Sequence, residues 1–178
     1  MDAIEAIMSR HAVRAFSGKT IPEDILAKIL EAGRFAPSPL NSQPWHFIVV
    51  RDKPSLKELA SHAVHGRFLQ DADLDIVVTM DSDAKVDSWL AEHEQHVYSG
   101  ACAIMDMWLA AWELGIGACW VSLDDKATRK TLSVPDDQKI LGSLALGYPK
   151  GPLPHHAANE RKPLSDVVFY ERFGNQNH

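Results

Sequence analysis

Hydrophobic residues recur at helical spacing in some stretches of the chain and at strand spacing in others. Short amphipathic helices are predicted over residues 2–8 and from the capping-box sequence Thr20-Ile21-Pro22-Glu23 to about Gly33. Two more short helices are predicted, one around residues 56–60 and one capped by Asp124 that ends before residue 134. Aromatic and β-branched residues predict strands over residues 45–50, 74–80, 118–123 and 139–148. The pattern therefore predicts a chain that mixes helices and strands.

The longest periodic segment runs from Val86 to Leu114 and predicts one long helix. Its apolar positions fall on a single broad stripe: Leu90, Val97, Ala101, Ile104, Trp108 and Trp112. A helix that is apolar over so much of its circumference is central to its fold or buried against another subunit. Gly115-Ile116-Gly117 ends it. Because this glycine pair follows a helix and lacks a third glycine, we do not expect a Rossmann dinucleotide site there.

The stretch from Ala36 to Pro44 contains three prolines and is predicted to be a rigid, shaped loop rather than a helix. Asn41 and Gln43 lie in it, and each amide offers both a hydrogen-bond donor and an acceptor. A stiff loop that carries such amides is suited to holding a flat polar ring.

Composition places few limits on function, but it excludes some classes. The 178 residues suit one domain over residues 1–178, and a net charge of −6 argues against general nucleic-acid binding. Cys102 and Cys119 indicate no disulfide framework, and Cys102 is predicted to be a buried thiol. The first residues lack the features of a signal peptide, and acidic residues interrupt the most apolar segment. We therefore expect a reduced, cytoplasmic protein with no membrane partner.

Two compact basic clusters stand out against the acidic background. Arg10 and Arg14 follow the first predicted helix, and Arg161-Lys162 lies near the other end of the chain. Each cluster alone could simply face solvent, and the first could also complement a helix C-terminus. If the two meet in space, they form a phosphate pocket. The histidine pairs at positions 62/65 and 93/96 lack an evident third ligand, so no metal site is expected.

Several segments, in their order along the chain, resemble the nitroreductase family of flavin-dependent oxidoreductases. The resemblance covers essentially the whole sequence. It is carried by Ser9-Arg10-His11-Ala12-Val13-Arg14, Ala36-Pro37-Ser38, Asn41-Ser42-Gln43-Pro44-Trp45-His46-Phe47, Leu114-Gly115-Ile116-Gly117-Ala118-Cys119-Trp120, Leu146-Gly147-Tyr148-Pro149 and Arg161-Lys162-Pro163.

The resemblance implies an α+β fold with a central, mostly antiparallel sheet, flanking helices and a long central helix. It also implies an intertwined homodimer with FMN at the subunit interface and a C-terminal arm, residues 151–178, that packs on the partner. The implied cofactor-binding residues are Arg10, His11, Ala12, Arg14, Pro37, Ser38, Asn41, Gln43, Trp120, Val121, Ser122, Arg161 and Lys162. Position 12 is commonly serine in the family, so Ala12 removes one hydroxyl contact.

The function implied is FMN-dependent transfer of hydride from NADH or NADPH to a small acceptor such as a nitroaromatic or a quinone. Donor and acceptor would alternate at one site, and no catalytic side chain is expected because the flavin carries the hydride. Two alternatives stay open. One is other reductive chemistry on the same fold, such as dehalogenation or reduction of an activated C=C bond. The other is a non-catalytic flavin-binding module.

Overall fold

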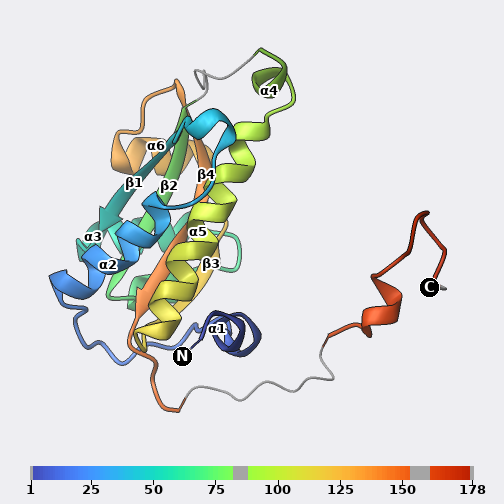
Figure 1. The fold of residues 1–178 in the computed structure, drawn as a ribbon. Helices are drawn as coiled ribbons and strands as arrows, with labels where there is room; N and C mark the ends of the chain where they lie inside the picture. Colours follow the sequence, from blue (N-terminus) through green and yellow to red (C-terminus); the bar gives the residue numbers. More distant parts are fainter. Residues whose placement is uncertain (1, 82–87, 153–160, 177–178) are drawn as a thin grey trace.

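The computed structural model describes residues 2–81, 88–152 and 161–176, and Figure 1 shows their arrangement. Helices and strands alternate irregularly along the chain, as an α+β protein requires. The elements are α1 (Ala3–Ser9), α2 (Glu23–Arg34), η1 (Pro39–Asn41), β1 (Trp45–Val50), α3 (Lys53–His62), η2 (Arg67–Asp71), β2 (Leu74–Asp81), α4 (Ser88–Glu92), α5 (Gln95–Glu113), β3 (Gly117–Val121), α6 (Asp125–Leu132), β4 (Gln138–Gly147) and η4 (Leu164–Asp166).

The four strands form one sheet in the order β1-β2-β4-β3, and every neighbouring pair is antiparallel. β2 is buried along its whole length except at Asp81, because it is an interior strand covered on both faces. β1 and β3 are the two edge strands. This confirms the predicted α+β class with an antiparallel sheet and leaves no parallel βαβ unit in the described sheet for a Rossmann site.

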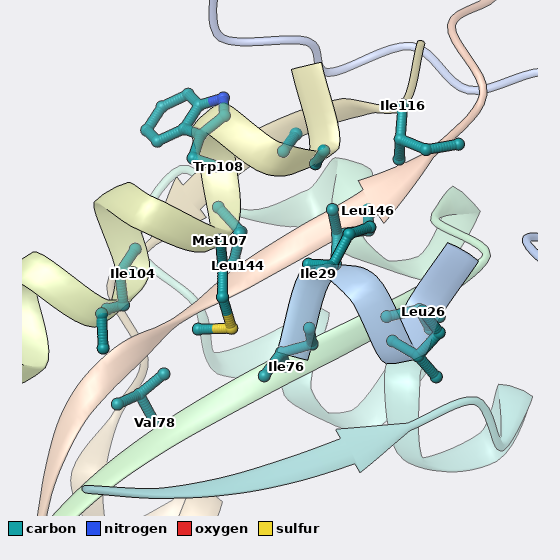
Figure 2. Close-up of a cluster of buried hydrophobic side chains, with 14 of the residues drawn as sticks. Leu26, Ile29, Ile76, Val78, Ile104, Met107, Trp108, Ile116, Leu144 and Leu146 are labelled. Carbon is teal, nitrogen blue, oxygen red and sulfur yellow. The ribbon is translucent and has the colours of Figure 1, made fainter. Parts of the chain in front are cut away.

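Alternate residues of β2 belong to two hydrophobic clusters, which lie on opposite faces of the sheet. Ile76 and Val78 pack with α2 and α5, and Figure 2 shows this cluster around Ile29, Ile104 and Met107. Val77, in contrast, packs with α3 and the turn after it. Burying an aliphatic side chain stabilises the fold by roughly 1.5–3 kcal/mol. The sheet is therefore the middle of three layers, with α2 and α5 on one face and α3 and α6 on the other.

The prediction of one helix from Val86 to Leu114 was wrong within the described residues. α4 ends at Glu92, and α5 starts only at Gln95, after Glu94 adopts a left-handed conformation with φ of 50°. The apolar stripe runs through this break, so periodicity alone did not reveal it. Positions 86 and 87 lie outside the described ranges.

Two signals at the ends of α2 were also misread. The helix is preceded by Pro22 without any side-chain cap, so Thr20 is not the N-cap. Gly33 is not the terminator, because it lies inside the helix, where an added Cβ would come within 2.7 Å of Met107 Cγ. The glycine instead allows α2 to approach α5 closely.

The prediction for residues 36–44 was partly wrong, since Pro39–Asn41 form a short 3-10 turn. Leu40 within it has a φ of 51°, which interrupts regular helical geometry. Cys102 is only half-buried, so it is not the buried thiol that was predicted; both cysteines are free.

Residues 161–176 contain only the three-residue η4 and extend away from the rest of the protein (Figure 1). Leu164, Val167 and Phe173 are exposed there, Phe173 by 92%. Of the rest of the predicted arm over 151–178, residues 153–160 and 177–178 lie outside the described residues. No helix among the described residues is long and apolar enough to cross a membrane.

Candidate functional site

The Arg10–Arg14 segment is held against the edge strand β3. Ala12 pairs with Ala118, and the Val13 N–H donates to the Ala118 carbonyl at 2.9 Å. Val13 is buried, and it packs so closely on Gly117 that an added Cβ there would lie 2.7 Å from Val13 Cγ1. Because an extended segment alternates its side chains, burying Val13 leaves Arg14 on the exposed side.

Two tryptophans one turn apart on α5 anchor the start of this segment. Trp112 Nε1 donates to Ser9 Oγ at 2.9 Å, and the His11 ring lies 5.9 Å from the Trp112 ring. The Arg10 guanidinium carbon lies 4.1 Å from the centre of the Trp108 ring, the geometry of a cation–π contact. Figure 2 shows the Trp108 indole at the margin of the hydrophobic cluster, turned away from the other labelled side chains.

Arg10 is a half-buried cation without a paired carboxylate among the described residues. Its Nε is buried and has no hydrogen-bond partner, and the same is true of Trp108 Nε1. Burial lowers the pKa of Arg10, and the nearby positive charge of Arg161 lowers it further. The two ends of the chain therefore bring like charges together around buried N–H donors, an arrangement that an anion would stabilise.

The Cys119 thiol lies beside both N-terminal arginines. Burial raises its pKa, while the charges of Arg14 and Arg10 and a hydrogen bond from Arg14 oppose that rise. Arg14 also lies over the Phe68 ring at 5.9 Å. Because burial is the largest effect, Cys119 is held as a neutral thiol rather than an activated nucleophile.

The outer edge of β3 is partly covered and partly open. Val13 donates to the Ala118 carbonyl and Val64 to the Ser122 carbonyl, so these two carbonyls face away from β4. By strand alternation the Trp120 backbone faces the same way, and its N–H has no backbone partner within the described ranges. The Trp120 indole lies over Gly142, where a side chain would collide with it. The segment thus presents a free backbone donor between two covered positions.

Residues 37–43 form a second shaped element, held by its own hydrogen bonds. The Gln43 N–H donates to Ser38 Oγ at 3.0 Å, and Gln43 Nε2 donates to the Asn41 carbonyl at 3.3 Å. Leu40, Asn41 and Gln43 all have positive φ, which is costly for residues other than glycine. Such strain is a feature of loops shaped for binding.

This loop and the arginines lie at opposite ends of the sheet. The Asp81 N–H donates to the Pro44 carbonyl, which fixes the loop at the last residue of β2. Ala118, which holds the arginine segment, pairs with Leu146, and Leu146 pairs with Leu74, the first residue of β2. At about 3.3 Å per residue the two ends of β2 are roughly 23 Å apart. Figure 1 likewise shows α1 near the C-terminal end of α5 and the light-blue turn before β1 near its other end.

The structure therefore brings some of the candidate residues together and separates others. Arg10 and Arg14 lie beside Cys119, which precedes the open backbone of Trp120, and Arg161 lies close to Arg10. His11 and Ala12 belong to the same segment as the two arginines, and Val121 and Ser122 follow Trp120 in the chain. Lys162 is exposed next to Arg161. The distant group is Pro37, Ser38, Asn41 and Gln43.

Sequence reasoning missed Trp108, Trp112 and Cys119 as neighbours of the arginines. The spacing of the two tryptophans marked them only as core positions of the long helix. Nothing in the sequence around Ser9 and Arg10 indicated that these two residues would contact that helix. No group of three or more potential metal ligands occurs among the described residues.

Comparison with known proteins decides the family. A model of the nitroreductase family matches residues 7–69 and 60–148, which include the Arg10–Arg14 segment, the loop before β1 and all four strands of the sheet. The chain belongs to the nitroreductase family. A protein from Archaeoglobus fulgidus, provisionally named an NADH dehydrogenase/NAD(P)H nitroreductase, is 33% identical over 165 residues, 90% of this chain and 92% of the relative.

Solved nitroreductases share the fold across nearly the whole chain. A nitroreductase family protein from Clostridium difficile superposes with a TM-score of 0.85 at 27% identity, covering 97% of this chain and 100% of the other. A provisionally named nitroreductase from Desulfovibrio desulfuricans, solved in complex with FMN, superposes with a TM-score of 0.79 at 28% identity, covering 97% and 99%. The predicted family and fold are thereby confirmed.

Proposed function

We propose that this nitroreductase family member is an FMN-dependent NAD(P)H oxidoreductase that reduces a small acceptor such as a nitroaromatic or a quinone. The observation that carries the proposal is Arg10, a half-buried and unpaired cation that faces a second cation, Arg161, from the far end of the chain. The FMN complex of the Desulfovibrio relative supports the choice of cofactor.

The residues present fit the charge of FMN. A phosphate dianion needs several donors and positive charge, and Arg10 Nε and Trp108 Nε1 are buried donors without a partner. Arg10, Arg161 and Lys162 would hold the phosphate, each through a charge-assisted bond worth about 1.5–3 kcal/mol. The Trp108 ring fixes the guanidinium of Arg10, so little of its rotational freedom would be lost on binding.

When bound, FMN supplies the redox chemistry, because its ring can take up a hydride from a reduced nicotinamide and release it to an acceptor. The protein's part is to hold the ring and to balance its charge. Arg14 is exposed next to the edge of β3, where a cation would stabilise negative charge on a reduced flavin. The backbone N–H of Trp120, with Val121 and Ser122 beyond it, would line the ring.

Ala12 and His11 contribute mainly through their positions. Ala12 pairs with Ala118 through its backbone, so its lack of a hydroxyl leaves the segment in place. His11 Nδ1 lies 2.6 Å from the Ser9 carbonyl, which fixes the turn that directs Arg10 onto Trp108. Both residues would therefore shape the cofactor site without chemistry of their own.

A second copy of the chain would complete the site. Pro37, Ser38, Asn41 and Gln43 lie about 23 Å from the arginine segment along β2, too far to share one flavin with it inside a protomer. In a homodimer the loop of the partner can meet the arginines of this chain. The exposed apolar residues of the arm over 161–176 would then be covered by the partner as well.

The decisive experiment is purification followed by anaerobic reduction. We expect a yellow protein with bound FMN that bleaches when NADH or NADPH is added and regains its colour with a nitroaromatic or quinone. A protein that does not bind FMN in a titration would contradict the cofactor assignment. Bound flavin that no reduced nicotinamide bleaches would instead identify a flavin-binding module.

Steady-state kinetics test the proposed order of events. If donor and acceptor use one site in turn, double-reciprocal plots at several acceptor concentrations will be parallel. Intersecting lines would exclude this simple alternation. A panel that also contains a halogenated aromatic and an activated enone separates the proposed acceptors from the other reductive chemistry that the fold could support.

A further inference from the structure

Two lysines, Lys53 and Lys150, line a cavity together with Arg14. The cavity has a volume of about 620 Å³ and is lined mainly by polar groups, among them Arg14, Ser17, Lys53, Gln70, Asp71 and Lys150. A volume of this size matches that of ordinary small-molecule sites, roughly 300–1,000 Å³. It is far larger than a single water or ion needs.

The walls of this cavity are fixed by hydrogen bonds between distant parts of the chain. The segment after Arg14 crosses the end of the sheet, where Ser17 donates to the Tyr148 carbonyl at 2.8 Å and Lys150 donates to the Ala15 carbonyl at 2.9 Å. These are backbone bonds, so the Lys150 side chain is not used by them. The cations are therefore carried on a frame that holds them near one another.

The charge in the cavity is unbalanced. Three cations and one carboxylate line it, and none of the described ion pairs involves any of the four. By contrast, Arg34, Arg51 and Arg129 each pair with a carboxylate elsewhere on the surface. Three cations that share a cavity without paired acids repel one another and favour an anion between them.

Lys53 is oriented and still has donors to offer. Its ammonium donates to the Ala72 carbonyl at 2.6 Å, which holds one of its three N–H groups. The other two stay available to a ligand. A lysine restrained in this way loses less freedom on binding than one that moves freely in solvent.

We propose that this cavity is an anion site for the phosphate monoester of a nucleotide-sized ligand, bound by Lys53, Lys150 and Arg14. The polar lining supplies hydrogen bonds for the rest of such a ligand. Two sources share this chemistry: the 2′-phosphate of NADPH and a free phosphorylated nucleotide. The first source rests on the proposed function, whereas the second does not.

Calorimetry on the flavin-loaded protein tests the site with adenosine 2′-monophosphate, adenosine 5′-monophosphate and adenosine as probes. We expect at least one phosphate ester to bind about tenfold more tightly than adenosine, and increasing salt to weaken it. Lys150→Gln and Lys53→Gln should each reduce that affinity by about tenfold, and Lys150→Arg should restore it.

Lys57→Gln is the matched control, because Lys57 is exposed on the same helix as Lys53 but does not line the cavity. It changes the net charge equally and should leave affinity unchanged. If the phosphate esters bind no better than adenosine, or if Lys57→Gln weakens them as much as Lys150→Gln, the site is refuted. FMN content, measured separately, shows whether a loss of binding reflects the flavin site instead.

Activity then distinguishes the two sources. If Lys150→Gln raises KM for NADPH about tenfold and leaves KM for NADH unchanged, the ligand is the 2′-phosphate of the hydride donor. If both KM values are unchanged while calorimetry shows the loss, the ligand is a free nucleotide. Both results support the anion site. Because calorimetry needs no turnover, an inactive protein would overturn the proposed function and leave the test of this cavity intact.

Discussion

At the scale of single residues, the protein keeps two ionisable side chains in places where most proteins avoid them. Arg10 is half-buried against an indole, and Asp75, the second residue of β2, is fully buried with neither carboxylate oxygen in a hydrogen bond of standard geometry. Placing such groups away from water is costly unless a ligand or a proton compensates. Each of them makes a testable prediction.

Arg10→Ala should reduce FMN affinity by about 10- to 100-fold while the fold persists, because the variant removes a charge-assisted contact outside the hydrophobic clusters. Flavin fluorescence titration measures the affinity, and circular dichroism measures the fold. Arg34→Ala is a suitable control, since Arg34 also lies over an aromatic ring, Phe35, but pairs with Glu31. Unchanged affinity in Arg10→Ala would contradict the phosphate site.

Asp75 should make the protein less stable as pH rises. Burial raises its pKa to about 7, against a smaller opposing effect of Ser143. The folded state therefore keeps the proton over a range in which the unfolded chain, with a pKa near 3.8, has lost it. Stability from this group is complete below the unfolded pKa and is lost as pH rises through the folded pKa.

Urea denaturation at about pH 5 and about pH 8 measures this effect, with the lower stability expected at the higher pH. Asp75→Asn cannot ionise and should flatten the dependence. Asp137→Asn, at an exposed position, should leave it as in the unmodified protein. Equal slopes in all three proteins would show that Asp75 does not titrate in this range.

At the scale of elements, close backbone approach decides where the helices and strands lie. Gly33 brings α2 onto α5, and Gly117 brings the arginine segment onto β3. Gly142 in β4 has a φ of 139°, and its neighbours leave no room for a side chain. An added Cβ would lie 2.9 Å from the Val121 carbonyl oxygen and 2.7 Å from the Trp120 indole nitrogen. It opposes Val78, next to the register shift between Val78 and Thr79.

Gly142→Ala should therefore destabilise the fold by about 3 kcal/mol, from backbone strain and steric overlap together. Gly18→Ala provides the comparison. Gly18 also has a positive φ, of 77°, but an added Cβ there meets nothing within 4 Å. It should cost only about 1 kcal/mol of strain. Urea denaturation measures the free energy of unfolding of both variants. If the two lose similar amounts, the residues around Gly142 must move to accommodate the added methyl group.

At the scale of the whole molecule, the two groups of candidate flavin-binding residues lie at opposite ends of the sheet. The protein also carries an arm whose large apolar residues face solvent in the isolated chain. Large apolar side chains exposed on one segment, here Leu164, Val167 and Phe173, are typical of an interaction surface. The proposed homodimer, in which each protomer would complete the site of the other, would explain both features.

Phe173→Asp should weaken such a dimer, because Phe173 is the most exposed aromatic residue of the arm and its ring centre lies 4.5 Å from that of Phe169, with the two rings tilted. Sedimentation velocity over a range of concentrations should show a larger monomer fraction, with flavin released alongside. Arg172→Ser, at the neighbouring exposed position, should sediment as the unmodified protein does. A stable, flavin-loaded monomer of the unmodified chain would contradict the dimer.

Much of the fold followed from the sequence because local patterns settle it. β1 was predicted over its observed range, since six aromatic and aliphatic residues between turn signals can hardly form anything else. Asp124 was expected to cap α6, and its side chain does accept from the Ala127 N–H. The family was also readable, because short motifs in a fixed order carry its signature.

What the sequence did not determine was which segments meet. The apolar stripe over residues 86–114 is continuous although the backbone breaks at Glu94, because a hydrophobic period records which face is buried and not whether the helix is unbroken. Gly33 was also misread as a helix terminator, because the sequence around it does not show the contact that requires a glycine. That contact is with Met107, which is 74 positions away.

The candidate site, like the fold, could be predicted from the sequence only in part. Sequence identified the residue types that could bind a flavin phosphate, because cations and amide side chains have recognisable chemistry. Only the tertiary structure showed that Arg10 rests on Trp108 near Arg161, and that Asn41 lies at the other end of β2. Distances between residues far apart in the chain are set by packing and by strand register, and neither is encoded in any single segment.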